Sequence, residues 1–187
     1  MARMHASKLI AGGRGLAQAL LRRAAVLALD WDTRQKSRFE AVDASGRRIG
    51  VFLPRGATVR GGDVLVAEDG GLIVVEALAQ PVIVVTARAA SRDRGLDLLR
   101  AAYHLGNRHV PLEVRGDRLV LEPDHVLAEM LVRMGLDVAE TRSPFEPEAG
   151  AYDASSGHHH GRDHGDGPDH RHDRGDCDGH DHGAKEQ

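Results

Sequence analysis

The last thirty residues limit which part of this chain can build a folded core. From residue 157 to residue 183 the sequence consists almost entirely of histidine, aspartate, glycine and arginine. This composition buries too little apolar surface to offset the entropy that is lost on ordering. We therefore expect residues 149–187 to form a disordered tail, and a folded core must come from residues 1–148, which are enough for one domain or two small ones.

Eight histidines are spread through this His-rich tail, between aspartates and glycines. A purification tag is normally an uninterrupted block of histidines, so the dispersed pattern favours a native metal-binding role. The neutral imidazole is a good ligand for nickel, copper, zinc and cobalt ions, and the tail is predicted to bind several divalent ions. The predicted ligands are His158, His159, His160, His164, His170, His172, His180 and His182.

The composition also excludes several classes of protein. Aromatic residues make up only 3% of the chain and the formal net charge is −3, so we expect no nucleic-acid partner. The only cysteine is Cys177, and the chain can form no disulfide within itself, which is typical of a reducing compartment. The sequence has no apolar run long enough to span a membrane, and glycines interrupt the basic N-terminus where a signal peptide would need such a run. We expect a cytoplasmic protein that does not bind membranes.

The first half of the chain consists of short apolar runs separated by turn residues. We expect the glycine-rich and basic residues 1–15 to be loose, and a short helical turn to follow within residues 15–23. Short strands at the spacing seen here are typical of a small all-β unit, either a barrel or a pair of sheets. The predicted strands are residues 24–29, 38–42, 48–53, 63–67 and 71–77. Together they indicate an N-terminal β domain over residues 1–79.

A different pattern begins near residue 80. Residues 82–86 are a continuous apolar run, which predicts a strand that is buried on both sides or central in a sheet. Ser91 is a suitable N-cap for a helix that reaches about residue 104, and Gly106 is expected to end this helix in the left-handed conformation. One face of the predicted helix carries Leu96, Leu99 and Tyr103. The second half thus starts with a strand and a helix.

The remainder of the second half adds a hairpin, another helix and a last strand. Asp124 is the predicted cap of the second helix, and Gly135 is its predicted end. The predicted strands are residues 108–114, 118–122 and 136–141. The order β-α-β-β-α-β is the ferredoxin-like pattern. The sequence therefore predicts an α+β protein, in which the small all-β domain is followed by a ferredoxin-like βαββαβ domain over residues 80–148 and then by the tail.

The sequence contains no signature of catalysis. It has no P-loop, no H-E-x-x-H and no G-x-S-x-G motif, so we expect no enzyme. Outside the tail there are four histidines, and the body offers no closed set of four nitrogen or sulfur ligands for a structural zinc ion. His5 lies among the residues that we expect to be loose, His104 suits the C-terminal dipole of a helix, and His125 follows the predicted helix cap.

His109 lies on the predicted strand over residues 108–114. Its core face carries Val110, Leu112 and Val114, so His109 is expected to point away from the core. Pro111 cannot donate to a strand ladder, which indicates an edge strand or a bulge. An exposed histidine at an edge can bind a metal or meet a symmetry mate, and an ordinary surface position is an equally good interpretation. Spacing alone does not show whether His125 comes close to it.

Several stretches of this sequence resemble one protein family. They are FLPRGATVRGGDVLVAEDG at residues 52–70, AAYHLGNRHVPLEV at residues 101–114, the pair Asp124-His125, and the His-rich end. All of them resemble the urease accessory protein UreE, a family of nickel metallochaperones. The similarity runs in order through residues 24–150, and the GNRH motif at residues 106–109 is its most specific part.

The resemblance implies a fold and a metal site. Members of this family have an N-terminal β domain and a C-terminal ferredoxin-like domain, and they form homodimers through the second domain. The histidine of the GNRH motif lies at that interface, which implies that His109 and its symmetry mate share one nickel ion. His125 matches a position that adds a further ligand in some members. Some relatives carry a His-x-His pair there, whereas this sequence has Pro123 in the first place.

The resemblance also implies a function and a partner. It implies a metallochaperone that delivers Ni(II) for assembly of the urease active site, together with the accessory GTPase UreG and the urease accessory complex. Zn(II) and Cu(II) are expected to compete for the same ligands in vitro, since imidazole binds all three ions. The alternative is a general nickel or zinc storage protein that acts mainly through its tail.

Overall fold

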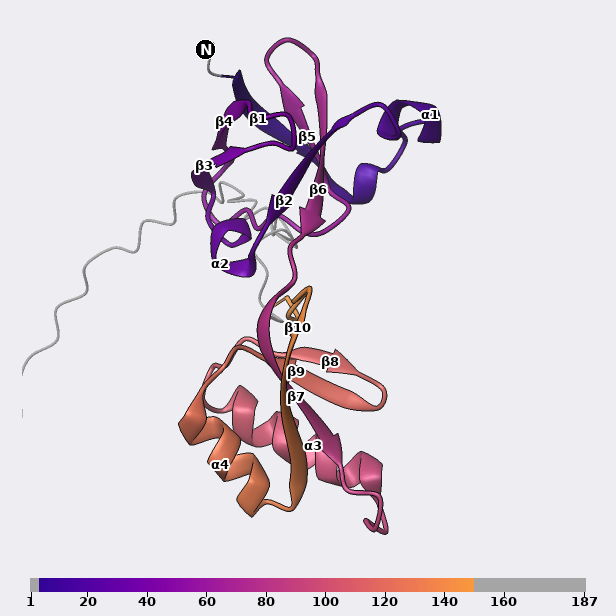
Figure 1. Ribbon diagram of the computed structural model, residues 1–187, viewed down its shortest axis with the longest axis vertical. Coiled ribbons are helices and arrows are strands. Elements are labelled where there is room, and N and C mark those ends of the chain that lie inside the picture. Colours follow the sequence, from indigo (N-terminus) through magenta and orange to yellow (C-terminus); the bar gives the residue numbers. More distant parts are fainter. Residues whose placement is uncertain (1–3, 150–187) are drawn as a thin grey trace, which may run out of the picture. The chain divides into compact units, whose positions relative to one another are not determined.

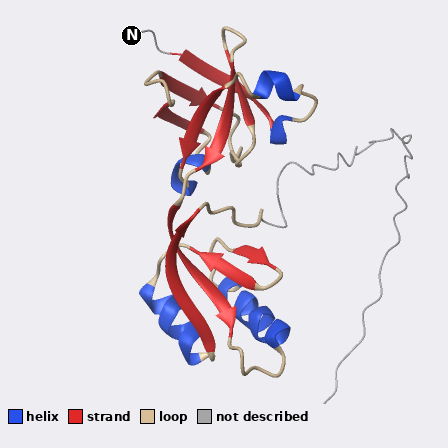
Figure 2. Ribbon diagram, turned by 45° about the vertical axis from the view of Figure 1, so that its right-hand side comes forward, coloured by secondary structure: helices blue, strands red, loops and turns tan. Residues whose placement is uncertain are grey.

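The computed structural model of the protein describes residues 4–149 (Figure 1). Its strands form a six-stranded sheet in the first half of this range and a four-stranded sheet in the second half. Short helices accompany the first sheet, and two longer helices lie beside the second (Figure 2). Apart from residue 149, the predicted tail lies outside the described residues, together with its eight histidines and Cys177.

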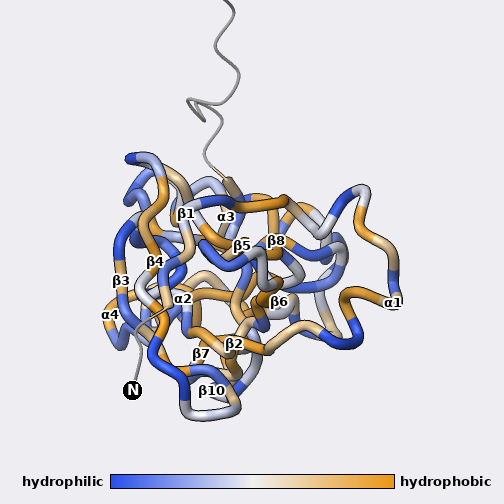
Figure 3. Tube along the Cα trace, turned by 90° about the horizontal axis from the view of Figure 1, so that it is seen from above, coloured by the Kyte–Doolittle hydropathy of each residue, from blue (hydrophilic) through white to orange (hydrophobic). Residues whose placement is uncertain are grey.

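The first sheet has the strand order β2-β6-β5-β1-β4-β3. Its strands are β1 (Met4–Ile10), β2 (Ala25–Leu29), β3 (Arg38–Val42), β4 (Arg48–Phe52), β5 (Val64–Ala67) and β6 (Leu72–Ala77). Hydrophobic residues recur along β2 and β6 (Figure 3), and the core includes the fully buried Leu27 and Ile49. The backbone N–H of Ala44 donates to the oxygen of Val26 (3.2 Å), which brings the turn after β3 to the free side of β2. The five predicted strands are therefore confirmed, and the sheet curls towards a barrel.

Three short helical segments connect these strands. They are the 3₁₀ turn η1 (Ala11–Gly13), α1 (Gln18–Leu21) and α2 (Trp31–Arg34). Helix α1 confirms the helical turn that was predicted within residues 15–23. Helix α2 was not predicted, because a single turn is too short to show a helical period. Its cap is Asp30, whose carboxylate accepts a hydrogen bond from the backbone N–H of Thr33 (2.9 Å).

The expectation that residues 1–15 are loose is wrong for β1. This strand lies inside the first sheet, where it pairs with β4 in parallel and with β5 in antiparallel orientation. Ala6 in its middle is fully buried. The sequence hides the strand for two reasons: it has few large apolar side chains, and a shift of register between Ala6 and Lys8 interrupts the alternation of buried and exposed positions. Backbone pairing on both sides holds this segment in place.

The second sheet has the strand order β10-β7-β9-β8, and all neighbouring strands are antiparallel. Its elements are β7 (Gln80–Ala87), α3 (Arg94–Gly106), β8 (Glu113–Arg115), β9 (Arg118–Leu121), α4 (His125–Arg133) and β10 (Leu136–Ser143). Both helices pack on one face of the sheet, where Leu105 of α3 and Leu131 of α4 are fully buried against Ile83 and Leu121. The predicted ferredoxin-like order is therefore confirmed.

Helix α3 differs from its prediction at its start and in its buried face. Its cap is Asp93 and not Ser91: the carboxylate of Asp93 accepts a hydrogen bond from the backbone N–H of Leu96 (2.9 Å). The residues that pack on the sheet are Leu98, Ala101 and Leu105, whereas Leu96, Leu99 and Tyr103 are exposed. The helix thus carries two apolar stripes, and the sequence shows both without indicating which one meets the sheet. None of the helices within residues 4–149 is long and apolar enough to cross a membrane.

The buried position of β1 predicts a sharp contrast between two neighbouring residues. The substitution Ala6→Asp places an unpaired carboxylate in the core of the first sheet and should destabilise the protein by more than about 3 kcal/mol. The same change at the exposed Ser7 should alter stability by no more than about 0.5 kcal/mol. Chemical denaturation followed by circular dichroism measures both, and equal stability of the two variants would contradict the central role of β1.

Candidate metal centre

His109 lies in the turn that closes the C-terminus of α3. The backbone N–H of Val110 donates to the oxygen of Leu105 (3.3 Å), and the N–H of His109 donates to the oxygen of Gly106 (2.9 Å). This pair of bonds is the Schellman arrangement, with His109 in the left-handed position. Leu105 and Val110 belong to the same apolar cluster, which is the hydrophobic contact that accompanies this motif. The turn therefore fixes the backbone of His109 from both sides.

The backbone of His109 is strained. Its φ angle is +55°, and no other residue except glycine has a positive φ within residues 4–149. This conformation costs an L-residue roughly 1–2 kcal/mol, which is why glycine usually occupies it. The prediction that Gly106 takes this conformation is wrong, because Gly106 is still helical and the left-handed residue comes three positions later. The protein thus has a strained backbone at a histidine, where a glycine would be unstrained.

The sequence contains one indication of this turn, but Gly106 obscures it. Leu105 and Val110 are both apolar and five residues apart, which is the spacing that the Schellman contact requires. Gly106 between them is the usual residue for a helix end, so the pattern pointed to an earlier stop. The conformation of His109 could not be found from residue types, because residues other than glycine rarely adopt a positive φ.

The strand predicted over residues 108–114 begins later than expected, at Glu113, because the turn precedes it. The predicted edge position of this strand, β8, is confirmed. Val110 and Leu112 pack against the core as predicted, whereas Val114 lies near the sheet edge and is 48% exposed. Glu113 alternates with Leu112 and Val114 and lies on the opposite face of the sheet, where it is buried.

The imidazole of His109 is exposed, and within residues 4–149 it has no hydrogen-bond or ion-pair partner. Both ring nitrogens are available to an external ligand, and imidazole is a good donor for borderline divalent ions. In the same part of the chain, no three His, Cys, Asp or Glu side chains lie close enough together to hold a metal ion. An ion at His109 would therefore need donors from outside these residues, such as a second copy of the chain.

The other three histidines of residues 4–149 occupy separate places. His104 is exposed in the last turn of α3, as predicted, and its backbone oxygen accepts a hydrogen bond from Arg108 Nη1 (2.9 Å). His125 is the exposed first residue of α4, and the predicted cap Asp124 is confirmed, since its carboxylate accepts bonds from two backbone N–H groups of that helix (2.8 and 2.9 Å). His5 lies in β1 near Glu68, with 3.7 Å between Nδ1 and Oε1. The structure assembles no ligand set from these side chains.

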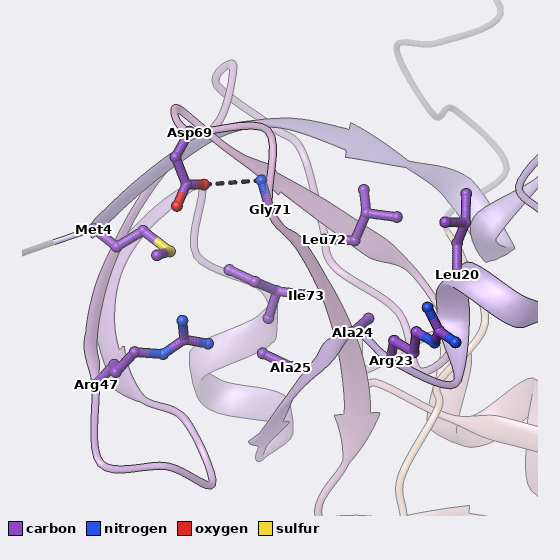
Figure 4. Close-up of a pocket in the computed structure, with 10 residues that line it drawn as sticks. All are labelled: Met4, Leu20, Arg23, Ala24, Ala25, Arg47, Asp69, Gly71, Leu72 and Ile73. Atoms are coloured by element: carbon purple, nitrogen blue, oxygen red, sulfur yellow. Dashed lines mark hydrogen bonds between the residues drawn. The ribbon is translucent and has the colours of Figure 1, made fainter.

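A cavity of about 280 Å³ in the first half of the chain offers no metal ligands of the required kind (Figure 4). Its single carboxylate belongs to Asp69 and accepts a hydrogen bond from the backbone N–H of Gly71 (2.8 Å). Arg47 on its rim pairs with Asp43. The lining residues include no histidine and no cysteine; they are Met4, Leu20, Arg23, Ala24, Ala25, Arg47, Asp69, Gly71, Leu72 and Ile73.

Comparison with known proteins gives consistent matches along the chain. Residues 6–78 match the N-terminal domain, and residues 80–183 the C-terminal domain, of the UreE urease accessory protein. The urease accessory protein UreE of Albidiferax ferrireducens is 62% identical over 157 residues, covering 84% of this chain and 89% of the relative. That of Methylibium petroleiphilum is 63% identical over 152 residues, covering 81% and 70%. That of Verminephrobacter eiseniae is 54% identical over 155 residues, covering 83% and 92%.

The chain combines a β domain, a ferredoxin-like domain and an exposed histidine on a helix-closing turn, and the domain models that it matches are those of an accessory protein. The chain belongs to the UreE urease accessory protein family. Its role is therefore in the maturation of urease, and the expectation that it is not an enzyme is confirmed by this membership.

The strained turn makes a prediction that separates stability from metal binding. His109→Gly and His109→Ala both remove the imidazole, but only glycine adopts a φ of +55° without strain. We expect the glycine variant to be more stable than the alanine variant by about 1 kcal/mol. Denaturant unfolding compares the two, and a more stable alanine variant would contradict the conformation assigned to His109.

Proposed function

We propose that the protein is a nickel metallochaperone, which delivers Ni(II) for assembly of the urease active site. The observation that carries this proposal is the exposed imidazole of His109, held without a partner among residues 4–149 on a strained turn. In a protein of urease maturation, such a side chain is better explained as a metal ligand than as a surface residue, since strain persists mainly at functional positions. Membership of the UreE family supports the same interpretation.

A single imidazole holds a divalent ion weakly, and a second copy of the chain would supply a second one. We propose a homodimer through the ferredoxin-like domain, in which the two His109 side chains share one ion. The outer face of α3 supports this, because Leu99 is 67% and Tyr103 is 66% exposed. Large exposed apolar side chains on one helix face are typical of an interaction surface. The helix that carries them ends in the turn of His109.

We propose that the ion at this shared site keeps open coordination positions. His125 would add a peripheral ligand, and the eight histidines of the tail would collect ions in exchangeable sites. Open coordination positions let ligands of a receiving protein replace those of the donor one at a time, whereas a closed set of four would retain the ion. The expected receiver is the GTPase UreG within the urease accessory complex. Zn(II) and Cu(II) should bind in vitro, and copper should bind more tightly than nickel.

The limits of the domains also stay a proposal. We place the β domain at residues 1–79, the ferredoxin-like domain at residues 80–148 and the tail at residues 149–187. The second candidate function is nickel or zinc storage through the tail alone, which the number of histidines in residues 157–183 favours. In that case His109 would make no contribution, and deletion of residues 157–187 would abolish the biological effect.

The two functions predict different effects of one substitution. At limiting nickel, His109→Ala should lower the activation of urease by about tenfold, on the scale seen when support of a metal ligand is lost. Most of the bulk nickel binding should remain, because it belongs to the tail. His104→Ala is the matched control, since His104 is an exposed histidine in the last turn of α3, five residues before His109. The measurements are urease activity in a reconstituted activation assay and calorimetric titration with nickel chloride. Full activation by His109→Ala would refute delivery through this site.

The proposed dimer makes a separate prediction. Leu99→Glu places a charge on the exposed face of α3 and should convert the dimer into a monomer with an unchanged circular dichroism spectrum. Val42→Glu serves as the control, because Val42 is exposed to a similar degree on β3. Light scattering after size exclusion gives the mass of each variant. A dimer that survives Leu99→Glu would exclude this face of α3 as the interface.

A further inference from the structure

The segment that follows β10 crosses the face of the second sheet that the helices leave open. We call residues 144–148 the strap; their sequence is Pro-Phe-Glu-Pro-Glu. The two prolines restrict the backbone to extended conformations, so the strap is stiff although it is neither helix nor strand. Phe145 is fully buried and packs with Val82 of β7 and Val120 of β9. The strap thus covers the two middle strands of the sheet.

Successive residues of the strap move from one edge of the sheet to the other. Ser143 at the end of β10 still pairs with β7. The backbone N–H of Glu146 donates to Glu113 Oε2 on β8 (2.8 Å), and the N–H of Glu148 donates to the oxygen of Leu112 (2.8 Å). Since β10 and β8 are the two edge strands, the chain travels three strand spacings, or about 14 Å. It arrives three residues after His109.

Two arginines from the first half of the chain clamp the strap. Arg34 Nη1 donates to Glu146 Oε1 (2.6 Å), and Arg34 Nη2 donates to the backbone oxygen of Phe145 (2.5 Å). Arg60 Nη1 donates to the backbone oxygen of Pro147 (2.6 Å). The guanidinium groups of both arginines also lie over the ring of Trp31, at 5.4 and 5.0 Å from its centroid. The clamp therefore holds both the carboxylate and the backbone of the strap.

The clamp leaves little freedom to the carboxylate of Glu146. Arg34 is fully buried; burial lowers its pKa, and the negative charge of Glu146 counteracts this. A buried guanidinium without an acidic partner is strongly destabilising, so the pair favours the docked strap. The backbone N–H of Gly61 donates to Glu146 Oε1 (2.8 Å), and a Cβ at Gly61 would lie 2.9 Å from the same oxygen. Only glycine permits this approach without displacement.

We propose that Arg34 and Glu146 are positioning residues for the His-rich tail. By holding the strap, they make the tail start at the β8 edge, beside the turn of His109, and not at the β10 edge. This inference rests on the proposed function, in which ions pass from the tail to His109. His158 follows Glu148 by ten residues, so it is the tail histidine that is nearest to the strap in sequence.

Release of the strap would move the point at which the tail leaves the folded domain, its origin, back to Ser143. The tail would then start about 14 Å further away, at the opposite edge of the sheet. Five more residues would separate it from His158, and chain length alone lowers the effective concentration of the tail histidines at His109 about twofold. The strap therefore acts on how often a histidine of the tail meets the transfer site, without contributing a ligand.

The position of the tail origin can be measured without metal. In the full chain with Cys177→Ser, a nitroxide on Ala149→Cys should broaden the amide resonances of Leu112 and of the His109 turn. Glu146→Ala should weaken the broadening at Leu112 and strengthen it at the end of β10. Gly61→Ala, which displaces the carboxylate without removing it, should act in the same direction. Glu148→Ala is the control, because the Glu148 side chain is exposed. Unchanged broadening at Leu112 in both Glu146→Ala and Gly61→Ala would overturn the proposal.

The effect of Glu146→Ala on nickel transfer must be distinguished from direct damage to the turn of His109. After mixing with one equivalent of nickel chloride, the amides around His109 should broaden about twofold more slowly in Glu146→Ala than in the parent. In a full-length variant with all eight tail histidines replaced by serine, Glu146→Ala should have no effect. An equal effect with and without the tail histidines would show that Glu146 acts on the turn itself and would overturn the proposal.

These two measurements also separate the inference from the proposed function. Nickel broadening that is unchanged by His109→Ala would refute His109 as the nickel ligand. The nitroxide experiment contains no nickel, so it tests the strap whatever the metal result is.

Discussion

The buried guanidinium of Arg34 is the constraint around which much of this protein is arranged. A charge without solvent access requires acceptors on every side, and here they come from Leu29, Phe145 and Glu146. The ion pair joins residues that are 112 positions apart in sequence. It thereby fixes the course of the chain after the last strand, which no local preference of a Pro-Phe-Glu-Pro sequence would determine. The strap, the cover over the second sheet and the place from which the tail departs all follow from this pair.

Most of the regular structure was predictable because local patterns decided it. The alternation of apolar runs with glycine, proline and aspartate gave the strands of the first sheet, and β3 has the predicted bounds, Arg38–Val42. Asp124 and Gly135 marked a helix whose cap and end are where they were predicted, with a φ of +86° at Gly135. Two elements were not predicted. Pairing with neighbouring strands stabilises β1, and a single capping hydrogen bond stabilises α2. Their own side-chain pattern carries little information.

The candidate site was predictable in identity but not in geometry. Exposure of His109 and the edge position of β8 followed from the sequence, and both are found. The turn could not be foreseen, because residue preferences assign the left-handed position to Gly106 and the tertiary contact of Val110 with the core moves it to His109. Likewise, periodicity found the stripe of Leu99 but could not tell which stripe of α3 faces water. A pattern gives the faces of a helix, and only the packed fold decides which of them is covered.

The left-handed backbone at His109 has a consequence for anyone who re-engineers this protein. Thermostability screens and design algorithms reward residues that relax the backbone, and at this turn the most favoured exchange is to glycine. A library selected for melting temperature alone would therefore discard the imidazole early, and the resulting proteins would fold well and express well. They would lack the side chain on which metal transfer is proposed to depend. In such work the residue at position 109 has to be held constant, although thermodynamics argues for its removal.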